Sequence, residues 1–329
     1  MDFKDFFDQF NGKRILVIGD VMVDAYIKGK VTRISPEAPV PIVQLEARED
    51  RLGGAANVAL NLSALGASPI LCSVIGNDKE AAMLTFLLNE NHISPEGIIE
   101  SSDRKTTVKT RVIGNHQQLL RIDSEQINAI TTEESKALID RVREICAQGI
   151  DAIIFEDYNK GVLTPSVIES IVNISKEFDI PTTVDPKKDN FLAFKNVTLF
   201  KPNLKELKEG LGRDFNFSND KLAFETAVRE LESFLNNTIS MVTLSEYGIF
   251  IKDNENQAYF PAHLRTISDV SGAGDTVISV ATLCLLVGMS NEIIAQVSNI
   301  AGGLVCEKSG VVPIDKQLLL EETIKLLGE

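Results

Sequence analysis

A short glycine-rich segment that ends in an aspartate, Ser271-Gly272-Ala273-Gly274-Asp275, precedes an apolar stretch over residues 277–289. The glycines allow a tight turn and let a ligand approach the backbone N–H groups closely. The apolar stretch has the length and composition of a buried helix, so the segment is predicted to begin a helix, where free N–H groups favour an anion. Beside such an anion cradle, an aspartate can be the base that a kinase acting on an alcohol needs. Taken alone, the segment fits a tight turn with an acidic helix start more simply.

Two carboxylates, Asp20 and Asp24, follow the apolar run R-I-L-V-I-G, which is typical of a buried parallel strand. Ligands of open α/β sheets bind beyond the carboxyl ends of the strands, so these carboxylates could accept hydrogen bonds from a polyol. A polar turn would explain them equally well. Gly53 and Gly54 begin the next helix, with Asn57 one turn further along. Small residues there suit the close approach of a sugar, and they also suit helix packing alone.

Polar residues also follow two later strands. Asn203 and Glu206 lie on one face of a first helical turn, where they could organise a ligand or simply form a helix cap, with Glu206 closing a capping box. The cap is the simpler interpretation. Thr243, Ser245 and Gly248 lie where a strand turns into a hairpin. Their hydroxyl and backbone groups could meet phosphates or merely satisfy the turn.

Composition excludes several classes of protein. The formal net charge of −14 argues against nucleic acid or an anionic membrane as partner, so an anionic substrate would need a local cluster of Lys and Arg. The four cysteines are far apart, and neither they nor the three histidines form a zinc-binding pattern. No secretory signal or membrane-length apolar segment is found, which predicts a cytoplasmic protein. The Walker A, G-x-G-x-x-G and G-x-S-x-G motifs are absent.

Strands and helices alternate along most of the chain, which predicts an α/β fold with a mostly parallel sheet covered by helices on both faces. Two segments interrupt the alternation: residues 25–48, with three prolines between β-prone stretches, and residues 106–123, which read as a hairpin around Gly114-Asn115. Both are predicted to form a small second sheet, a candidate lid. The expected strands are 14–19, 69–75, 152–155, 182–184, 197–200 and 239–244, and the expected helices are 54–65, 79–89, 165–178, 204–209, 220–235 and the C-terminal region.

The ordered motifs G-D-x-x-x-D, G-G-A-A-N, D-P-K, K-P-N-x-x-E, T-L-x-x-x-G and S-G-A-G-D resemble those of the ribokinase-like (PfkB) sugar kinases. They run from Gly19 to Asp275, so the resemblance covers nearly the whole chain and implies one ribokinase-like domain over residues 1–329. That domain would be a three-layer α/β/α unit with a β-sheet lid. Each motif is weak alone, but coincidence of all six in order is improbable.

Three further segments, R-I-S-P-E-A-P-V-P (33–41), H-Q-Q-L-L-R-I-D (116–123) and D-Y-N-K-G (157–161), resemble the D-glycero-D-manno-heptose 7-phosphate kinases. These enzymes phosphorylate the anomeric hydroxyl, giving the 1,7-bisphosphate on the route to ADP-heptose and lipopolysaccharide. Many relatives carry a nucleotidylyltransferase domain as well. Because this sequence ends with the kinase region, that step is expected in a separate protein. Ser271 replaces the family's usual threonine, and Ser245-Glu246 replaces a glycine after T-L; neither change removes the expected activity.

The resemblance implies ATP and Mg²⁺ as cofactors and leaves a monovalent cation open. Asp275 would be the general base, and the N–H groups of Gly272, Ala273 and Gly274 would stabilise the transferring phosphoryl group. The remaining implied roles fall into three groups. The sugar would be bound by Asp20, Asp24, Gly53, Gly54 and Asn57. Its phosphate would be bound by Lys109, Arg111, Arg121, Lys160 and Lys187. The ATP and Mg²⁺ side would be lined by Asn203, Glu206 (holding the metal through water), Thr243, Ser245, Gly248 and Asn299.

Alternatives stay open at this stage. The basic hairpin residues also fit a solvated lid face. A homodimer through the lid is implied by the resemblance alone. The nearest rival function is a ribokinase-like kinase for another sugar or sugar phosphate, and a more distant one is a catalytically inactive sugar-phosphate sensor. Intact Asp275 argues against the sensor, which needs no base.

Overall fold

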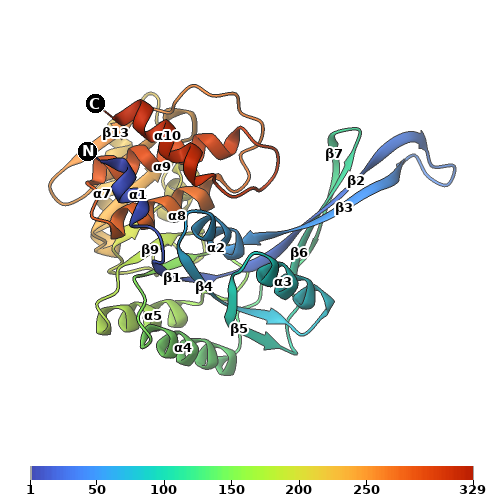
Figure 1. Cartoon of the computed structure of the whole chain (residues 1–329), viewed down its shortest axis with the longest axis horizontal. Helices are drawn as coiled ribbons and strands as arrows, with labels where there is room; N and C mark the ends of the chain where they lie inside the picture. The colour runs from blue at the N-terminus through green and yellow to red at the C-terminus, as the bar shows by residue number, and fades with distance from the viewer. Residues whose placement is uncertain (1, 329) are drawn as a thin grey trace.

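The structure is a computed structural model that describes residues 2–328, and its centre is a nine-stranded sheet (Figure 1). Neighbouring strands from β11 to β5 run parallel, and β12 and β13 add an antiparallel edge. The strand order is β13 (Gln257–Phe260), β12 (Ile249–Lys252), β11 (Ile239–Thr243), β10 (Leu199–Phe200), β9 (Thr182–Asp185), β8 (Ala152–Glu156), β1 (Arg14–Gly19), β4 (Ser68–Gly76) and β5 (Ser94–Ser101).

Helices cover both faces of this sheet because its central strands are apolar on both sides. Along β1, Ile15 and Val17 belong to one buried cluster, whereas Leu16 and Ile18 belong to the other. The first cluster is covered by α1 (Phe3–Asp8), α2 (Ala55–Ala64), α3 (Lys79–Glu90), α8 (Ala273–Leu286), α9 (Asn291–Cys306) and α10 (Lys316–Leu327); the second is covered by α4 (Thr132–Cys146), α5 (Pro165–Glu177), α6 (Leu204–Leu211) and α7 (Lys221–Leu235).

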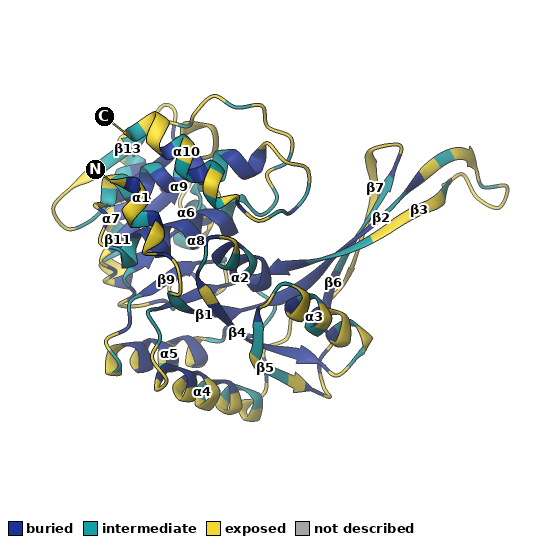
Figure 2. Ribbon diagram, in the orientation of Figure 1, coloured by how far each residue is buried: buried dark blue, intermediate teal, exposed yellow. Residues whose placement is uncertain are grey.

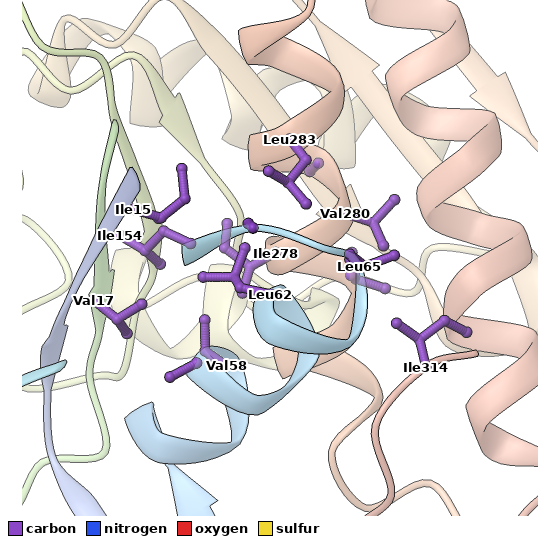
Figure 3. Packing of buried hydrophobic residues seen from close by; sticks show 14 of the residues in the cluster. Ile15, Val17, Val58, Leu62, Leu65, Ile154, Ile278, Val280, Leu283 and Ile314 are labelled. Atoms are coloured by element: carbon purple, nitrogen blue, oxygen red, sulfur yellow. The ribbon is translucent and has the colours of Figure 1, made fainter. Parts of the chain in front are cut away.

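Helix α2 lies at the centre of the first cluster. Its Val58 and Leu62 belong to the same buried cluster as Ile15 of β1 and Ile278 of α8, and α2 contacts both β1 and α8 (Figure 3). Helices α2 and α8 therefore share one packing surface. Because both helices begin near the same end of the sheet, this packing sets the distance between their N-termini.

A second, four-stranded sheet projects from the helical layers (Figures 1 and 2). Its order is β3 (Pro41–Gly54), β2 (Val21–Ile34), β6 (Thr107–Gly114) and β7 (Gln117–Ser124). Only Asp20 separates β1 from β2, and β3 runs directly into α2. The outer part of the sheet is largely exposed, whereas its base is buried (Figure 2). The base of the projecting sheet is therefore built into the end of the central one.

The predicted three-layer fold with a mostly parallel sheet and a small second sheet is confirmed. The hairpin around Gly114-Asn115 is present as β6 and β7. Helices α1 and α4 and strand β5 are not among the predicted elements, although α4 has a complete capping box at Thr131 and Glu134. The predicted strand over residues 197–200 is shorter, covering Leu199–Phe200 only. No helix within residues 2–328 has the length and apolarity needed to cross a bilayer.

The second cluster contains a group of aromatic rings whose packing can be tested. Phe224 of α7 is fully buried, with ring centroids of Phe217 and Phe250 at 5.1 and 5.0 Å. We expect Phe224→Ala to lower the free energy of unfolding by about 3–5 kcal/mol, because the cavity adds to the lost burial. Urea unfolding measures the change. Phe234→Ala on the same helix is the control, since that ring is 49% exposed, and an equal loss in both variants would contradict the packing described.

Candidate active site

The carboxyl ends of neighbouring parallel strands bring together residues that lie far apart in the sequence. Strands β1, β8 and β9 end at Gly19, Glu156 and Asp185 in one register. The helices α2 and α8 begin at the same edge, because Asn57 of α2 contacts Asp275 of α8. This edge is where open α/β sheets bind their ligands.

The glycine-rich segment forms the start of α8, as predicted. Gly272 precedes the helix with φ of +79°, a left-handed conformation that favours glycine, and no side chain caps the helix at this position. Ala273, Gly274 and Asp275 form its first turn. The N–H groups of Gly274 and Asp275 belong to the set that a helix N-terminus leaves unpaired, whereas the Ala273 N–H donates to the Val270 carbonyl at 3.3 Å. A Cβ on Gly274 would lie 3.2 Å from Asp185 Oδ2, so a side chain there would crowd this carboxylate. The arrangement is suited to binding an anion.

Asp275 is the carboxylate beside this cradle, and it is buried. Asn57 Nδ2 donates to its Oδ2 at 2.6 Å, and the Tyr158 hydroxyl donates to its Oδ1 at 2.9 Å. Burial raises the pKa of Asp275, whereas the hydrogen bonds from Asn57 and Tyr158 oppose that shift. Two neutral donors thus hold a carboxylate whose pKa lies above its usual value, and such a group can accept a proton.

Asp20 anchors the loop that carries Tyr158. Its carboxylate accepts hydrogen bonds from the backbone N–H groups of Tyr158, Lys160 and Val162, at 2.9, 3.0 and 3.1 Å. Burial raises the pKa of Asp20 against the effect of these bonds. In this structure the residue predicted to bind sugar hydroxyls therefore also fixes the 158–162 loop.

A group of buried carboxylates and lysines lies next to the start of α8, near Gly274. Lys201 Nζ pairs with Asp185 at 2.8 Å, and Lys187 Nζ pairs with Glu206 at 2.6 Å. Burial works against the charge of both lysines, but the carboxylates outweigh it and raise the pKa of each. The remaining member, Glu156, has its pKa raised strongly by burial and by the charge of Asp185. The two lysines thus form ion pairs with Glu206 and Asp185.

Asn203 and Glu206 form the cap that was the simpler interpretation of their spacing. The Asn203 side chain accepts from the Glu206 N–H, and Glu206 Oε2 accepts from the Asn203 N–H, each at 2.8 Å. The other Glu206 oxygen pairs with Lys187. Both carboxylate oxygens of the predicted metal residue are therefore engaged within the protein.

The second sheet contributes an ion pair at its base. Arg111 of β6 pairs with Asp24 of β2, and its guanidinium lies over the Tyr26 ring at 5.4 Å. Arg51 of β3 lies over the same ring at 5.0 Å and donates to the Val311 carbonyl at 3.0 Å. A Cβ on Gly53 would lie 2.2 Å from Asp24 Oδ2, so glycine is required for this strand to pass so close. Gly54 follows as the N-cap of α2.

The other predicted basic residues lie in different settings. Lys160 pairs with Glu125 at 2.8 Å, and Arg121 pairs with Asp123 of its own strand at 2.9 Å. Lys109 lies on the same strand face as Arg111, two residues away, and burial together with the charge of Lys160 lowers its pKa. The positive charge of Lys160 thus acts on Lys109, and two neighbouring positive charges favour the binding of an anion.

The residues expected on the ATP side are spread around the end of β11. Thr243 forms an isolated bridge with Asn203, so these two predicted residues are adjacent. Ser245, with φ of +54°, begins a short 3₁₀ helix, η1 (Ser245–Tyr247), which Gly248 follows. Asn299 of α9 donates to the Pro261 carbonyl at 2.8 Å. No hydrogen bond within residues 2–328 joins Asn299 to the carboxylate cluster.

Four residues of this site were not singled out from the sequence: Tyr158, Glu156, Lys201 and Arg51. Tyr158 lies in the D-Y-N-K-G segment and Lys201 in the K-P-N-x-x-E motif. Both follow a strand closely, and this position could have marked them as site residues. Glu156 ends a buried strand, where a charged residue is unusual. Nothing local distinguishes Arg51 from other surface arginines, because its contact with residue 311 is set by the tertiary fold.

Comparison with known proteins shows the family to which the chain belongs. The sequence profile described as "pfkB family carbohydrate kinase" matches residues 13–317. A "Bifunctional protein HldE" of Citrifermentans bemidjiense is 38% identical over 321 residues, covering 97% of this chain and 65% of that protein. The protein of the same name from Methylobacillus flagellatus is 40% identical over 308 residues, covering 94% and 62%. The chain thus spans slightly less than two thirds of the length of these relatives.

Among solved structures, phosphofructokinase-2 from Escherichia coli in complex with potassium superposes with a TM-score of 0.78. The alignment covers 94% of this chain and 99% of that one, at 20% sequence identity. The likeness shows a shared ribokinase-like fold.

Proposed function

We propose that this chain, which belongs to the pfkB family of carbohydrate kinases, transfers the γ-phosphoryl group of ATP to the anomeric hydroxyl of D-glycero-D-manno-heptose 7-phosphate. The observation that carries the proposal is Asp275, a buried carboxylate held by two donors at the uncapped start of α8. The heptose substrate is supported by the three segments that resemble heptose 7-phosphate kinases. The product, a 1,7-bisphosphate, would serve the synthesis of ADP-heptose and lipopolysaccharide.

In this mechanism Asp275 takes the proton of the attacking hydroxyl, which contributes about 10²–10⁴-fold to the rate. Its raised pKa suits that task, because the protonated form becomes accessible during transfer. The N–H groups at the start of α8 stabilise charge on the phosphoryl oxygens without reorganising. Asn57 and Tyr158 hold the carboxylate in place, so they act as positioning residues.

Kinases of this kind use Mg²⁺ with ATP, and the carboxylates below the cradle suit it because Mg²⁺ prefers oxygen ligands. Glu156 and Asp185 are the residues that would hold it, and Glu206 would act through water. The ion would neutralise phosphate charge. Thr243, Ser245, Gly248 and Asn299 belong to the ATP side of the proposal, and a monovalent cation stays open.

The second sheet supplies the sugar-phosphate side. Asp24, Gly53 and Gly54 lie at its base with Arg111, whose guanidinium suits bidentate contact with phosphate. Lys109 and Lys160 add positive charge beside it. We assign the sheet the role of a lid that excludes water, since water would otherwise accept the phosphoryl group. The assignment of residues 1–329 to one cytoplasmic kinase domain belongs to the same proposal.

The first test measures ATP consumption with Mg²⁺ and heptose 7-phosphate, sedoheptulose 7-phosphate, fructose 6-phosphate or ribose. We expect turnover of heptose 7-phosphate alone and a loss of about 10²–10⁴-fold in kcat for Asp275→Asn. Turnover of another sugar would retain the kinase mechanism and reject the heptose assignment. If ATP binds and no sugar reacts, the inactive sensor becomes the better description.

A second test uses the pH dependence of kcat/KM. The hydrogen bond from Tyr158 lowers the pKa of Asp275, so Tyr158→Phe should raise that pKa and move the acid limb of the profile to higher pH. We expect a displacement of about one pH unit, because a hydrogen bond to a charged group contributes about 1.5 kcal/mol and 1.36 kcal/mol corresponds to one unit. Tyr259→Phe removes a hydroxyl that donates to Glu225 instead and should leave the limb in place. An unmoved limb in Tyr158→Phe rejects the positioning role.

The exposed apolar face of the second sheet supports a homodimer. Leu120 and Ile122 of β7 project from one face and are 54% and 52% exposed, and Leu45 of β3 is 63% exposed. We expect light scattering to give twice the chain mass of 36.1 kDa for the wild type and the single chain mass for Leu120→Lys/Ile122→Lys. Leu222→Lys on α7, where the side chain is 70% exposed, is the control. A wild-type monomer, or a double variant that stays dimeric, rejects this interface.

A further inference from the structure

Arg104 is a buried arginine that binds backbone groups instead of a carboxylate. It lies shortly before β6 and is only 9% exposed. Charged residues buried to this degree are almost always paired with an opposite charge. Within residues 2–328 its guanidinium forms no ion pair, and it donates to two backbone carbonyls, those of Asn128 at 2.8 Å and Lys160 at 2.5 Å. Arg104 therefore connects its own segment to two others.

The three segments meet where the chain enters and leaves the second sheet. Asn128 follows β7, so Arg104 and Asn128 lie on either side of the hairpin formed by β6 and β7. Lys160 belongs to the 158–162 loop. A second contact joins the same segments, because Glu125, directly after β7, pairs with Lys160 Nζ at 2.8 Å. Both ends of the hairpin are thus attached to the 158–162 loop.

The 158–162 loop packs against the segment after β7 backbone to backbone. The Ile130 N–H donates to the Gly161 carbonyl at 3.0 Å. Gly161 has φ of +88°, and a Cβ there would lie 2.1 Å from the Asn128 carbonyl oxygen, so this approach requires glycine. The two chain segments therefore bring the carbonyls of Asn128 and Lys160 within reach of one guanidinium, whose planar fork can donate to two acceptors at once.

Opposite charges hold Lys160 from two sides. Its N–H donates to Asp20 at 3.0 Å, and its carbonyl accepts from Arg104. Both charged residues are buried. Burial lowers the pKa of Arg104, and the charge of Asp20 opposes that shift. The two charges thus offset part of the cost of each other's burial, with the backbone of Lys160 between them.

We propose that Arg104 is a positioning residue, which together with Asp20 fixes the backbone of the 158–162 loop and attaches that loop to the ends of β6 and β7. The loop carries Tyr158, whose hydroxyl donates to the proposed base at 2.9 Å, and Lys160, assigned above to the sugar-phosphate side. The effect of Arg104 on catalysis rests on the proposed kinase function. Its effect on the loop does not, since that effect depends only on contacts within the chain.

The first measurement is hydrogen–deuterium exchange of the full chain without ligands. Arg104→Met keeps an unbranched side chain and removes its donors. We expect the segment 157–162 to exchange at least about tenfold faster than in the wild type, because its amide hydrogens are protected only while the loop stays closed. Rates are compared with those of α7, so that a loss of global stability, which speeds exchange in both segments, does not count.

The matched control is another arginine that donates to two backbone carbonyls. Arg14, at the start of β1, donates to the carbonyls of Gln148 and Gly149, each at 2.7 Å. This is the end of β1 opposite to the candidate active site. Arg14→Met should therefore leave the exchange of the segment 157–162 and the catalytic constants unchanged.

The second measurement is steady-state kinetics with ATP and heptose 7-phosphate. In Arg104→Met we expect the KM for the sugar phosphate to rise and kcat to fall, each about tenfold, because both Lys160 and Tyr158 are displaced. The KM for ATP should stay unchanged, since Arg104 does not bond to residues of the ATP side. A role in stability alone would leave all three constants of the folded enzyme unchanged. In Arg104→Met/Tyr158→Phe the fall in kcat should be smaller than the product of the two single effects.

Wild-type exchange of the segment 157–162 in Arg104→Met, or single effects on kcat that simply multiply in the double variant, would overturn the proposal. If Arg104→Met does not fold, Arg104→Gln replaces it under the same criteria, because its shorter side chain cannot bridge the two carbonyls. Failure of the kinase function gives a different result. Faster loop exchange without any sugar turnover would reject the kinase and keep the role of Arg104, whereas turnover with an unchanged loop would do the reverse.

Discussion

Carboxylates withdrawn from water must be matched by donors or cations, and this requirement organises the carboxyl end of the central sheet. Asp20, Asp185 and Asp275 are all buried there. Each is matched differently: Asp20 by backbone N–H groups, Asp185 by a lysine, and Asp275 by an amide and a phenol. The differences matter chemically, because a carboxylate held by neutral donors keeps more of its basicity than one paired with a cation.

These partners come from distant parts of the chain, so the site exists only when the layers are assembled. Asn57 reaches Asp275 across 218 positions of sequence, and the Tyr158 N–H reaches Asp20 across 138. The packing of α2 against β1 and α8 sets the first of these contacts (Figure 3). Changes in the apolar core beneath the site will therefore shift the position of Asp275 without altering any polar group.

The sequence predicts the central architecture well because its strands are continuous apolar runs and its motifs lie at their ends. It also predicts the glycine-rich start of α8, which needs only local features, namely two glycines and an apolar helix. It does not predict that Asp20 anchors a loop or that Arg51 reaches residue 311, because both depend on which segments the fold places side by side. Helix α4 was not predicted for a different reason. Its few apolar residues are separated by charged ones and give a weak helical pattern, although its capping box is present in the sequence.

The junction between the two sheets has a mechanical consequence. Strand β2 begins one residue after β1, and the residue between them, Asp20, is fixed by three backbone hydrogen bonds. The ladder between β2 and β3 is regular from there to Lys28, and its register shifts only further out, at Lys28/Gly29 and Val31/Arg33. Because strands bend where a bulge interrupts the ladder, the outer half of the second sheet can take a direction different from that of its base. Asp24 and Arg111 lie in the regular part of the sheet, so their position is set by the central sheet and does not depend on that bend.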